Sequence, residues 1–448
     1  MKKEVSLTEG SIAKGMIAFA VPLLLGQLFQ QLYNMADSLI VGNYLGSDAL
    51  AAVSSTSSLI LLFVGFFNGL SVGAGVVIAR YYGAKEKRRL HVAIHTSIAF
   101  AILCGVIITI LGVVFSPQIL RLMGTPEDVM VQAVIYLRVY FLGTLGVVLY
   151  NMCRGILQAV GDSKHPLYYL IISSIVNIVL DLVFCGAFRW GVGYAALATT
   201  ISQFVSVFLC MYRLMRVDEV YQVNWREIKL DVAMLKQVVG IGLPSGVQNS
   251  ITSISNIVVQ SNINAFGTMA MAGSGAYAKV EGFGFLPVTC FSMALTTFVG
   301  QNLGAGKYDR VKKGSIFGIG CTMLLAEAVG VIMYVFAPQL VSMFDRNAEV
   351  IAYGTTHGKT VALFYFLMAF SHAVAAVMRG AGKSAVPMVV VLVSWCAIRI
   401  AYITVAVRLF ENIQVVFGAY PITWTISAGI FLICLLKASW MRSIKQKT

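Results

Sequence analysis

The segment 22-PLLLGQLFQQLYNMADSLIVGNYLGSDALAA-52 decides the fold class of this chain. It contains no Lys or Arg, and its apolar part is long enough to cross the hydrocarbon core of a membrane as a helix, which takes about 20 residues. About eleven further apolar stretches of similar length are separated by short polar or basic turns. With 58% hydrophobic and only 12% charged residues, the chain has more apolar surface than a soluble core of this length needs.

Twelve transmembrane helices are therefore predicted, with almost nothing left for a soluble domain. A helix satisfies its own backbone hydrogen bonds in lipid, and the alternating segments of about ten residues that are typical of transmembrane barrels do not occur in the sequence. The predicted fold class is an all-α polytopic membrane protein with spans at residues 16–41, 49–80, 91–115, 129–160, 166–188, 192–215, 238–264, 270–302, 312–337, 350–380, 386–410 and 416–438.

The net charge of +14 could indicate a nucleic-acid-binding protein, but the positive residues are placed as topology signals. Lys and Arg gather at the N-terminus, in the loop 85-KEKRR-89, in the connector 213–236 and in the C-terminal tail, all on one side of the predicted helices. We expect this side to be the cytoplasm of a bacterium, with the protein in the plasma (inner) membrane and both termini inside. No nucleic-acid partner and no cleavable signal peptide are expected.

The chain contains two copies of one sequence unit. At an offset of 221 residues, scaffold positions align without a gap from Gly46 to Pro166, and further upstream Pro22 aligns with Pro244 at an offset of 222. Six spans separate equivalent positions, so both copies are expected to have the same orientation in the membrane. We predict six-helix lobes at residues 1–212 and 237–448, joined by a cytoplasmic linker at 213–236. Transporters bind substrate between such halves.

Polar residues lie on one face of several predicted spans, where their cost in lipid indicates function. In the first span the stripe has spacings of 3, 4 and 3, which place its members on one helix face: Gln27, Gln30, Asn34 and Asp37. The seventh span repeats it with Asn249, Thr252, Asn256 and Gln260. The amides are interpreted either as bonds between helices or as a substrate cavity lined by Gln30, Asn34, Asn249, Asn256 and Gln260.

Two aspartates in the first and fifth spans are the strongest site candidates. An ionised carboxylate in lipid must find a cation, a hydrogen-bond donor or a proton, and neither span contains Lys or Arg. If Asp37 and Asp181 lie close together they titrate as a pair, which suits the exchange of a proton or Na⁺. In the second copy Val259 and Tyr402 stand at these positions, so we expect ion coupling in the N-terminal half alone.

The second half has its own intramembrane charges, which the sequence leaves open to more than one interpretation. Glu281 is predicted either to bind a cationic substrate in the cavity or to form an ion pair with Lys279 or Arg399. Glu327 is a further acid, in the ninth span. Such residues are functional candidates by default because burial of a charge in lipid is expensive.

Three other patterns are interpreted as structural. The eight cysteines have no CxxC spacing and are expected to pack as small apolar residues. His91 and His95 have metal-like spacing but lie at a basic loop, where a cytoplasmic helix end is predicted. The segment 380-GAGKS-384 is similar to the end of a phosphate loop, but Val377 replaces the leading glycine, so ATP is not expected as the energy source.

Four parts of the sequence suggest a family: 22-PLLLGQLFQQLYNMADSLIVGNYLGSDALAA-52, 177-NIVLDLVF-184 with 195-AALAT-199, 299-VGQNLGAGKYDRVKKG-314 and 379-RGAGKSAVP-387. Together they resemble the multidrug and toxic compound extrusion (MATE) transporters, and within them the DinF-like bacterial branch. The resemblance covers essentially the whole chain.

The resemblance implies a V-shaped pair of six-helix lobes that opens alternately to each side and exports amphipathic organic cations in exchange for Na⁺ or H⁺. It implies that the first helix bends at Pro22, and that the coupling ion binds at Asp37, Asn177, Asp181 and Thr199, with the carbonyl of Ala195 as a further ligand. Beyond this ion no cofactor is expected. The expected partners are small organic cations and the lipid bilayer, and the expected form is a monomer without enzymatic activity.

Two other functions remain as alternatives. A flippase for a lipid-linked glycan precursor shares repeated helical lobes, but it needs several basic residues to hold a pyrophosphate, and the sequence offers Lys279 and Arg399. An intramembrane aspartyl protease also uses two membrane aspartates. It would have a Gly-x-Gly-Asp motif, whereas Asp181 lies in 178-IVLDLV-183.

Overall fold

The computed structural model describes residues 7–437, apart from the side chains of residues 47, 48, 50 and 58. Every regular element in this range is helical, which confirms the predicted fold class. The first half comprises α1 (Ile12–Leu45), α2 (Ser47–Gly83), α3 (Lys87–Leu122), α4 (Glu127–Leu142), α5 (Thr144–Ala159), α6 (Lys164–Asp181), the π-helical segment η1 (Leu182–Ala187) and α7 (Val192–Arg216).

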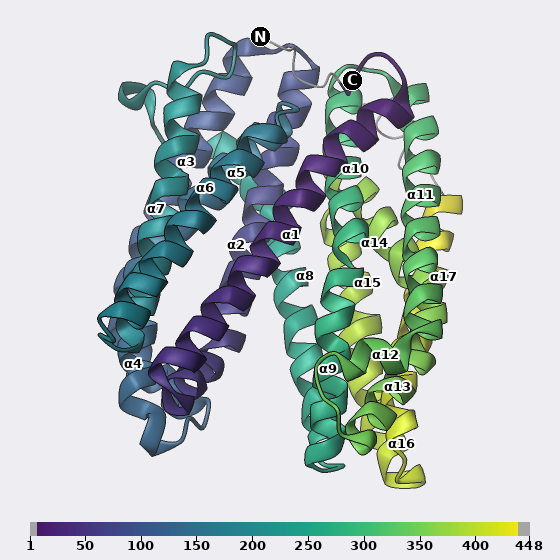
Figure 1. The fold of residues 1–448 in the computed structure, drawn as a ribbon. Helices are drawn as coiled ribbons and strands as arrows, with labels where there is room; N and C mark the ends of the chain where they lie inside the picture. Colours follow the sequence, from purple (N-terminus) through teal and green to yellow (C-terminus); the bar gives the residue numbers. More distant parts are fainter. Residues whose placement is uncertain (1–6, 438–448) are drawn as a thin grey trace. The chain divides into compact units, whose positions relative to one another are not determined.

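The second half repeats this series with more interruptions (Figure 1). After the short helix η2 (Trp225–Glu227), it comprises α8 (Val232–Asn264), α9 (Thr268–Gly284), α10 (Leu286–Gly304), α11 (Tyr308–Val335), α12 (Ala337–Ser342), α13 (Ala348–Val361), η3 (Ala362–Phe364), α14 (Tyr365–Gly380), α15 (Ala385–Val391), the π-helical segment η4 (Leu392–Ile398), α16 (Arg399–Phe410) and α17 (Ile413–Leu436).

Within the described residues, all twelve predicted spans fall on one helix or on consecutive helices of the structure; residue 438, the predicted end of the last span, lies outside them. Among the described residues, 10 helices are long and apolar enough to cross a membrane, and the number is 11 if α4 and α5, bent by 45° at Gly143, count as one span. The remaining predicted span is α8, which has 33 residues. Its polar stripe keeps it out of that set, because amides and hydroxyls lower the hydropathy of a helix that is otherwise long enough.

The helices form two compact units. The N-terminal unit contains Ala18–Gly246 together with residues 7–11 and Gly300–Lys307, and the C-terminal unit contains Ile12–Ile17, Val247–Val299 and residues 308–437. α1 and α8 therefore each contribute to both units. The unit boundary falls inside α8, after Gly246 and downstream of the predicted linker.

The core of the N-terminal unit is built from α2, α3, α5 and α7, with one contribution that the sequence did not indicate. Val217, Tyr221 and Val223 of the connector after α7 are buried in the same apolar cluster. The connector was expected to be a polar, basic linker. Because these three side chains anchor it, part of it belongs to the core of this unit.

Glycines allow α2 to approach two other helices closely within the N-terminal unit. A Cβ atom on Gly73 would lie 2.3 Å from the backbone of Gly242, an arrangement typical of small-residue contacts between membrane helices. At the end of α2, Gly83 packs on Gln301 and Gly304 packs on Arg80. Gly83 and Gly304 are equivalent in the repeat, as are Arg80 and Gln301. Each glycine thus packs on the residue of the other copy that is equivalent to the one three positions before it in its own copy. Such a reciprocal contact is expected if the equivalent helices have the same orientation in the membrane.

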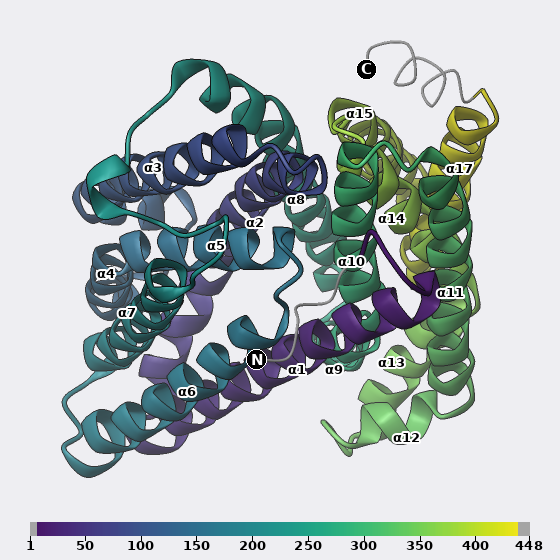
Figure 2. The same cartoon turned by 90° about the horizontal axis from the view of Figure 1, so that it is seen from above.

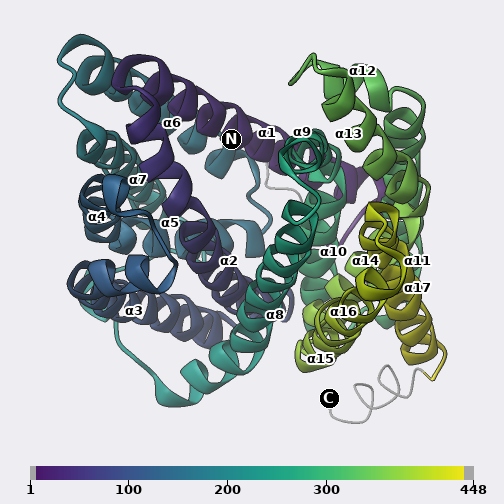
Figure 3. The same ribbon diagram turned by 90° about the horizontal axis from the view of Figure 1, so that it is seen from below.

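Two packing arrangements position the polar residues of the units. In the N-terminal unit α1 runs alongside α6, and Gly26 faces Leu167 and Leu170 of α6 (Figure 2). In the C-terminal unit α14, α16 and α17 lie side by side (Figure 3). Its core cluster includes Tyr365 of α14 and Trp424 of α17.

Candidate ion-coupling site

The site begins at the end of α6, where the helix changes its winding. Asn177 and Asp181 lie one turn apart and are 1% and 0% exposed. Asp181 is the last residue of α6, and the π-helical segment Leu182–Ala187 follows directly. A π-helical turn has wider spacing and is frequent at functional sites. The wider turn begins directly after the buried carboxyl group.

Asp37 of α1 brings the second carboxyl group. The side chains of Asp37 and Asp181 lie close enough to share a proton. As two carboxylates they have no proton between them, and within the part of the chain that the structure describes no donor reaches the buried Asp37 Oδ1 or either side-chain oxygen of Asp181. An unsatisfied buried carboxylate is expensive. The pair therefore needs a bound proton or a bound cation.

Asn177 adds two more unsatisfied atoms to the site. Its side-chain nitrogen and oxygen are both buried without a hydrogen-bond partner among the described residues. Hard cations prefer oxygen ligands such as carboxylates and amide carbonyls, and a protonated carboxyl group could equally donate to the amide oxygen. The donor set thus suits either Na⁺ or a proton.

Tyr136 and Cys185 also belong to this region, and sequence reasoning missed both. Both side chains lie within electrostatic range of Asp37 and Asp181. Tyr136 of α4 is 6% exposed, and its hydroxyl is a candidate donor to the pair. No spacing pattern in the sequence marks a single tyrosine in the fourth span, so only the packing of α4 reveals it.

The two α7 residues of the predicted ligand set lie one helical turn apart. Thr199 Oγ1 donates a hydrogen bond to the carbonyl oxygen of Ala195 at 3.2 Å. Ala195 is 1% exposed and packs in the same apolar cluster as Tyr136 and Cys185. Ala195 thus shares an apolar cluster with two residues that interact with the acid pair, and its carbonyl oxygen accepts a bond from Thr199.

Pro22, the predicted bend, is buried inside α1, which is helical from Ile12 to Leu45. A proline inside a helix removes one backbone hydrogen bond at the preceding turn. α1 therefore lacks one backbone hydrogen bond near Pro22, 15 residues before Asp37.

The residues predicted to line a substrate cavity are divided between the units. Gln30 and Asn34 lie on the α1 part of the N-terminal unit, whereas Asn249, Asn256, Gln260 and Glu281 lie in the C-terminal unit. Gln260 Nε2 donates to Asn264 Oδ1 at 2.8 Å. The side chains of Asn34 and Asn256 are exposed. The cavity itself stays a prediction.

The structure separates the alternatives for Glu281. Lys279 is exposed, with Nζ 5.6 Å from the centre of the Phe344 ring. Arg399 is 1% exposed and lies within electrostatic range of Glu281. The hydroxyl of Tyr365 donates to Glu281 Oε1 at 2.9 Å. Of these two cations, Arg399 is therefore the one within electrostatic range of Glu281.

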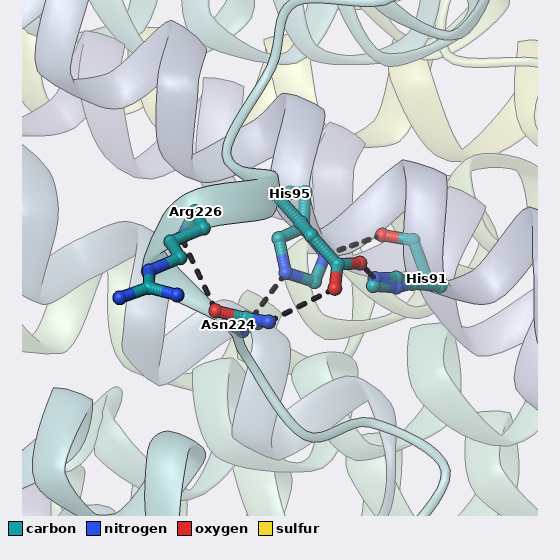
Figure 4. A network of polar contacts seen from close by, with 5 residues as sticks. His91, His95, Asn224 and Arg226 are labelled. Atoms are coloured by element: carbon teal, nitrogen blue, oxygen red, sulfur yellow. Dashed lines mark hydrogen bonds and ion pairs between the residues drawn. The ribbon is translucent and has the colours of Figure 1, made fainter.

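His91 and His95 hold the connector against α3 (Figure 4). Their rings stack with centres 3.9 Å apart, and His91 Nε2 lies 2.7 Å from a carboxylate oxygen of Glu227. The backbone N–H of Asn224 donates to His95 Nε2 at 3.0 Å, while His95 Nδ1 lies 2.8 Å from the carbonyl oxygen of His91. His95 must therefore be neutral, with its proton on Nδ1.

Comparisons with known proteins agree with this architecture. The sequence profile of the MatE family matches the chain twice, at residues 22–183 and 244–405. A probable multidrug resistance protein, YoeA of Bacillus subtilis, is 30% identical over 387 residues, which is 85% of this chain and 84% of that protein. The probable multidrug resistance protein NorM of Thermotoga maritima is 26% identical over 405 residues, which is 89% of this chain and 87% of that protein.

Solved structures match over the full length. A crystal structure of MATE in complex with MaL6 superimposes with a TM-score of 0.92 and 25% identity, covering 100% of both chains. An outward-facing multidrug resistance MATE family transporter of the MOP superfamily gives a TM-score of 0.91 at 25% identity, covering 100% of this chain and 99% of that one. The double match confirms the tandem repeat, and this chain belongs to the MatE family, the multidrug and toxic compound extrusion transporters.

Proposed function

We propose that this protein is a secondary active antiporter of the bacterial plasma membrane that exports amphipathic organic cations in exchange for Na⁺ or H⁺. The single observation that carries the proposal is the acid pair Asp37 and Asp181, which meets in the N-terminal unit with three buried side-chain oxygens that have no donor among the described residues. A purely structural pair would have donors or a cation supplied by the protein. The names of the relatives, which refer to multidrug resistance, suggest the substrate class.

The coupling follows from the electrostatics of the pair. An ion or proton from outside neutralises Asp37 and Asp181, because two adjacent carboxylates in low dielectric cannot both remain ionised alone. Binding of the ion or proton changes the hydrogen bonding of α1, the helix that contains both Asp37 and the missing backbone hydrogen bond at Pro22. Exchange then requires that ion and substrate favour different states, since a ligand with equal affinity for both states shifts nothing.

The coupling half, the family branch and the membrane topology are inferred from individual residues of the sequence. The absence of acids at Val259 and Tyr402 supports coupling in the N-terminal half and the placement in the DinF-like branch. The positive residues of the loops support cytoplasmic termini. Arg399 is sequestered against Thr423 and two aromatic rings, which does not favour the flippase, because a pyrophosphate needs accessible cations.

The test is ethidium efflux from vesicles under an imposed pH or Na⁺ gradient. Wild type should respond to one of the two gradients, and Asp37→Asn should lose the response because the amide keeps the shape of the side chain without its charge. Asp218→Asn, at an exposed aspartate of the connector, is the matched control and should behave as wild type. Unchanged gradient-driven efflux by Asp37→Asn would sink the proposal.

A further inference from the structure

The C-terminal unit contains a buried chain of three hydrogen-bonding groups that the acid pair does not involve. Tyr277 of α9 and Tyr365 of α14 place their hydroxyl oxygens 2.6 Å apart. The Tyr365 hydroxyl also lies 2.9 Å from Glu281 Oε1. Both tyrosines are at most 1% exposed. The half-buried carboxyl group of Glu281 is thus connected to two buried hydroxyl groups by short bonds.

The protons of this chain can be arranged in two orders. Each hydroxyl group has one proton to donate and can accept another. With Glu281 ionised, Tyr277 donates to Tyr365 and Tyr365 donates to Glu281. With Glu281 protonated, Glu281 can donate to Tyr365 and Tyr365 to Tyr277. The same side-chain positions therefore satisfy both the charged and the neutral carboxyl group, which the N-terminal pair does not achieve.

Arg399 fixes the charge balance around this carboxyl group. Its guanidinium nitrogens Nε and Nη2 donate to Thr423 Oγ1 at 3.2 and 2.9 Å. Its Cζ lies 4.7 Å from the ring centre of Tyr420 and 5.7 Å from that of Trp395. The aromatic rings are already occupied by the protein's own cation. An organic cation or Na⁺ beside Glu281 would meet this charge, whereas a proton only neutralises the carboxylate.

We propose that Glu281, with Tyr365 and Tyr277 as its hydrogen-bonded partners and Arg399 as its counter-charge, is a second proton-binding site in the C-terminal unit. In the binding step a hydronium ion gives its proton to the Glu281 carboxylate: one O–H bond breaks on the hydronium ion, one forms on Glu281, a water molecule is left, and nothing is oxidised or reduced. The site adds to the proposed function, which places coupling at the N-terminal acids. Its proton binding stands independently of that function, whereas a contribution to transport rests on it.

The other groups around Glu281 have partners of their own. The titratable and charged side chains that interact with Glu281 are Tyr277, Tyr365, Arg399 and Tyr420. Two further groups lie beside the hydroxyl chain: His357 of α13 contacts the Tyr277 ring, and Glu327 of α11 bonds the backbone next to Tyr365. Glu327 Oε2 accepts from the backbone N–H of Phe366 at 3.3 Å. His357 Nδ1 lies 3.0 Å from Ser274 Oγ, and the ring stacks on Phe417. Among the described residues, Glu281 is the acid that the hydroxyl chain reaches.

Infrared difference spectroscopy on the purified full-length protein tests the proposal, because a neutral carboxyl group has its own C=O band. The measurement is made in an Asp37→Asn/Asp181→Asn background, so that the N-terminal acids cannot contribute. A pH titration should show a carboxyl band that disappears in Glu281→Gln. In Tyr365→Phe the band should persist at a shifted frequency, because the hydroxyl partner is gone. Glu327→Gln is the matched control and should keep the band.

Each other outcome overturns the proposal. If no band depends on Glu281 at any pH at which the protein stays folded, Glu281 is a permanently ionised structural partner of Arg399. If addition of Na⁺ at constant pH removes the band and a lower pH restores it, Na⁺ competes with the proton and the site binds a metal ion instead. Should Glu281→Gln not fold, Glu281→Asp and Tyr365→Phe provide the same readout, because both would alter the band of a genuine proton site. Since no transport is measured, failure here leaves the ethidium test of the acid pair unaffected.

Discussion

The two units differ in the partners that they provide for their acidic side chains. In the N-terminal unit Asp37 and Asp181 meet with side-chain oxygens that have no donor among the described residues, and the predicted spans 16–41 and 166–188 contain no Lys or Arg. In the C-terminal unit Glu281 has a hydroxyl donor and a buried guanidinium within range. One frame, duplicated in the sequence, thus holds one acid pair that needs a bound proton or cation and one acid that has a hydroxyl donor and a guanidinium within range. The difference shows that duplication of the helices did not duplicate the chemistry.

The largest expected effect is on transport, and it distinguishes the acid pair of the N-terminal unit from Glu281 of the C-terminal unit. Asp181→Asn should reduce gradient-driven efflux by about tenfold to a hundredfold, the range of a coupling free energy of roughly 1–3 kcal/mol. The double variant Asp37→Asn/Asp181→Asn should be no worse than either single variant, because the two carboxyl groups act as one unit. Efflux rates in vesicles measure both. Losses that simply multiply in the double variant would mean two independent sites.

The next effect concerns the internal cation of the C-terminal unit. Arg399→Leu should lower the free energy of unfolding by about 3–5 kcal/mol, since removing one partner of a buried charge pair leaves the other uncompensated. Thermal unfolding in detergent measures it. Arg408→Leu, at an exposed arginine of the same helix α16, should leave the melting temperature nearly unchanged. Equal melting of the two variants would contradict a balanced C-terminal site.

A smaller effect tests the frame that supports the N-terminal site. Gly73→Ala should cost about 1–3 kcal/mol of stability, as overpacking does, because its Cβ would lie 2.3 Å from the backbone of Gly242. Gly75→Ala, two residues away, would place its Cβ an ordinary 3.5 Å from Gly155. Denaturation curves of the two variants should therefore differ. If they coincide, α2 and α8 do not pack at these glycines.

The smallest effect lies at the connector. His95→Phe should destabilise the protein by about 1 kcal/mol, because the backbone N–H of Asn224 loses its acceptor. Protection of the connector amides against hydrogen exchange measures the local opening. Arg226→Ala, whose exposed side chain is outside these bonds, is the control. Unchanged amide protection in His95→Phe would show that Val217, Tyr221 and Val223 alone hold the connector.

Part of the site was predictable because its signals are local. Asn177 and Asp181 lie one turn apart on α6, and that spacing places them on one face in any helix. The stripe on α1 points Asp37 to an interior face in the same way. Tyr136 and Cys185 give no such signal, since a single polar or small residue in an apolar span is usual. Their role depends on the packing of α4 and η1, which no local pattern specifies.

The sequence by itself determined the helices and the duplication, because hydropathy and spacing act over a single helix and a repeat is visible letter by letter. The sequence also limited the candidate functional acids to a few positions. Only the tertiary structure decided that Asp37 and Asp181 face each other, that Arg399 rather than Lys279 lies within electrostatic range of Glu281, and that the connector is anchored in a core. The physical reason is that these pairings join residues far apart in the chain, whose distances depend on how whole helices pack.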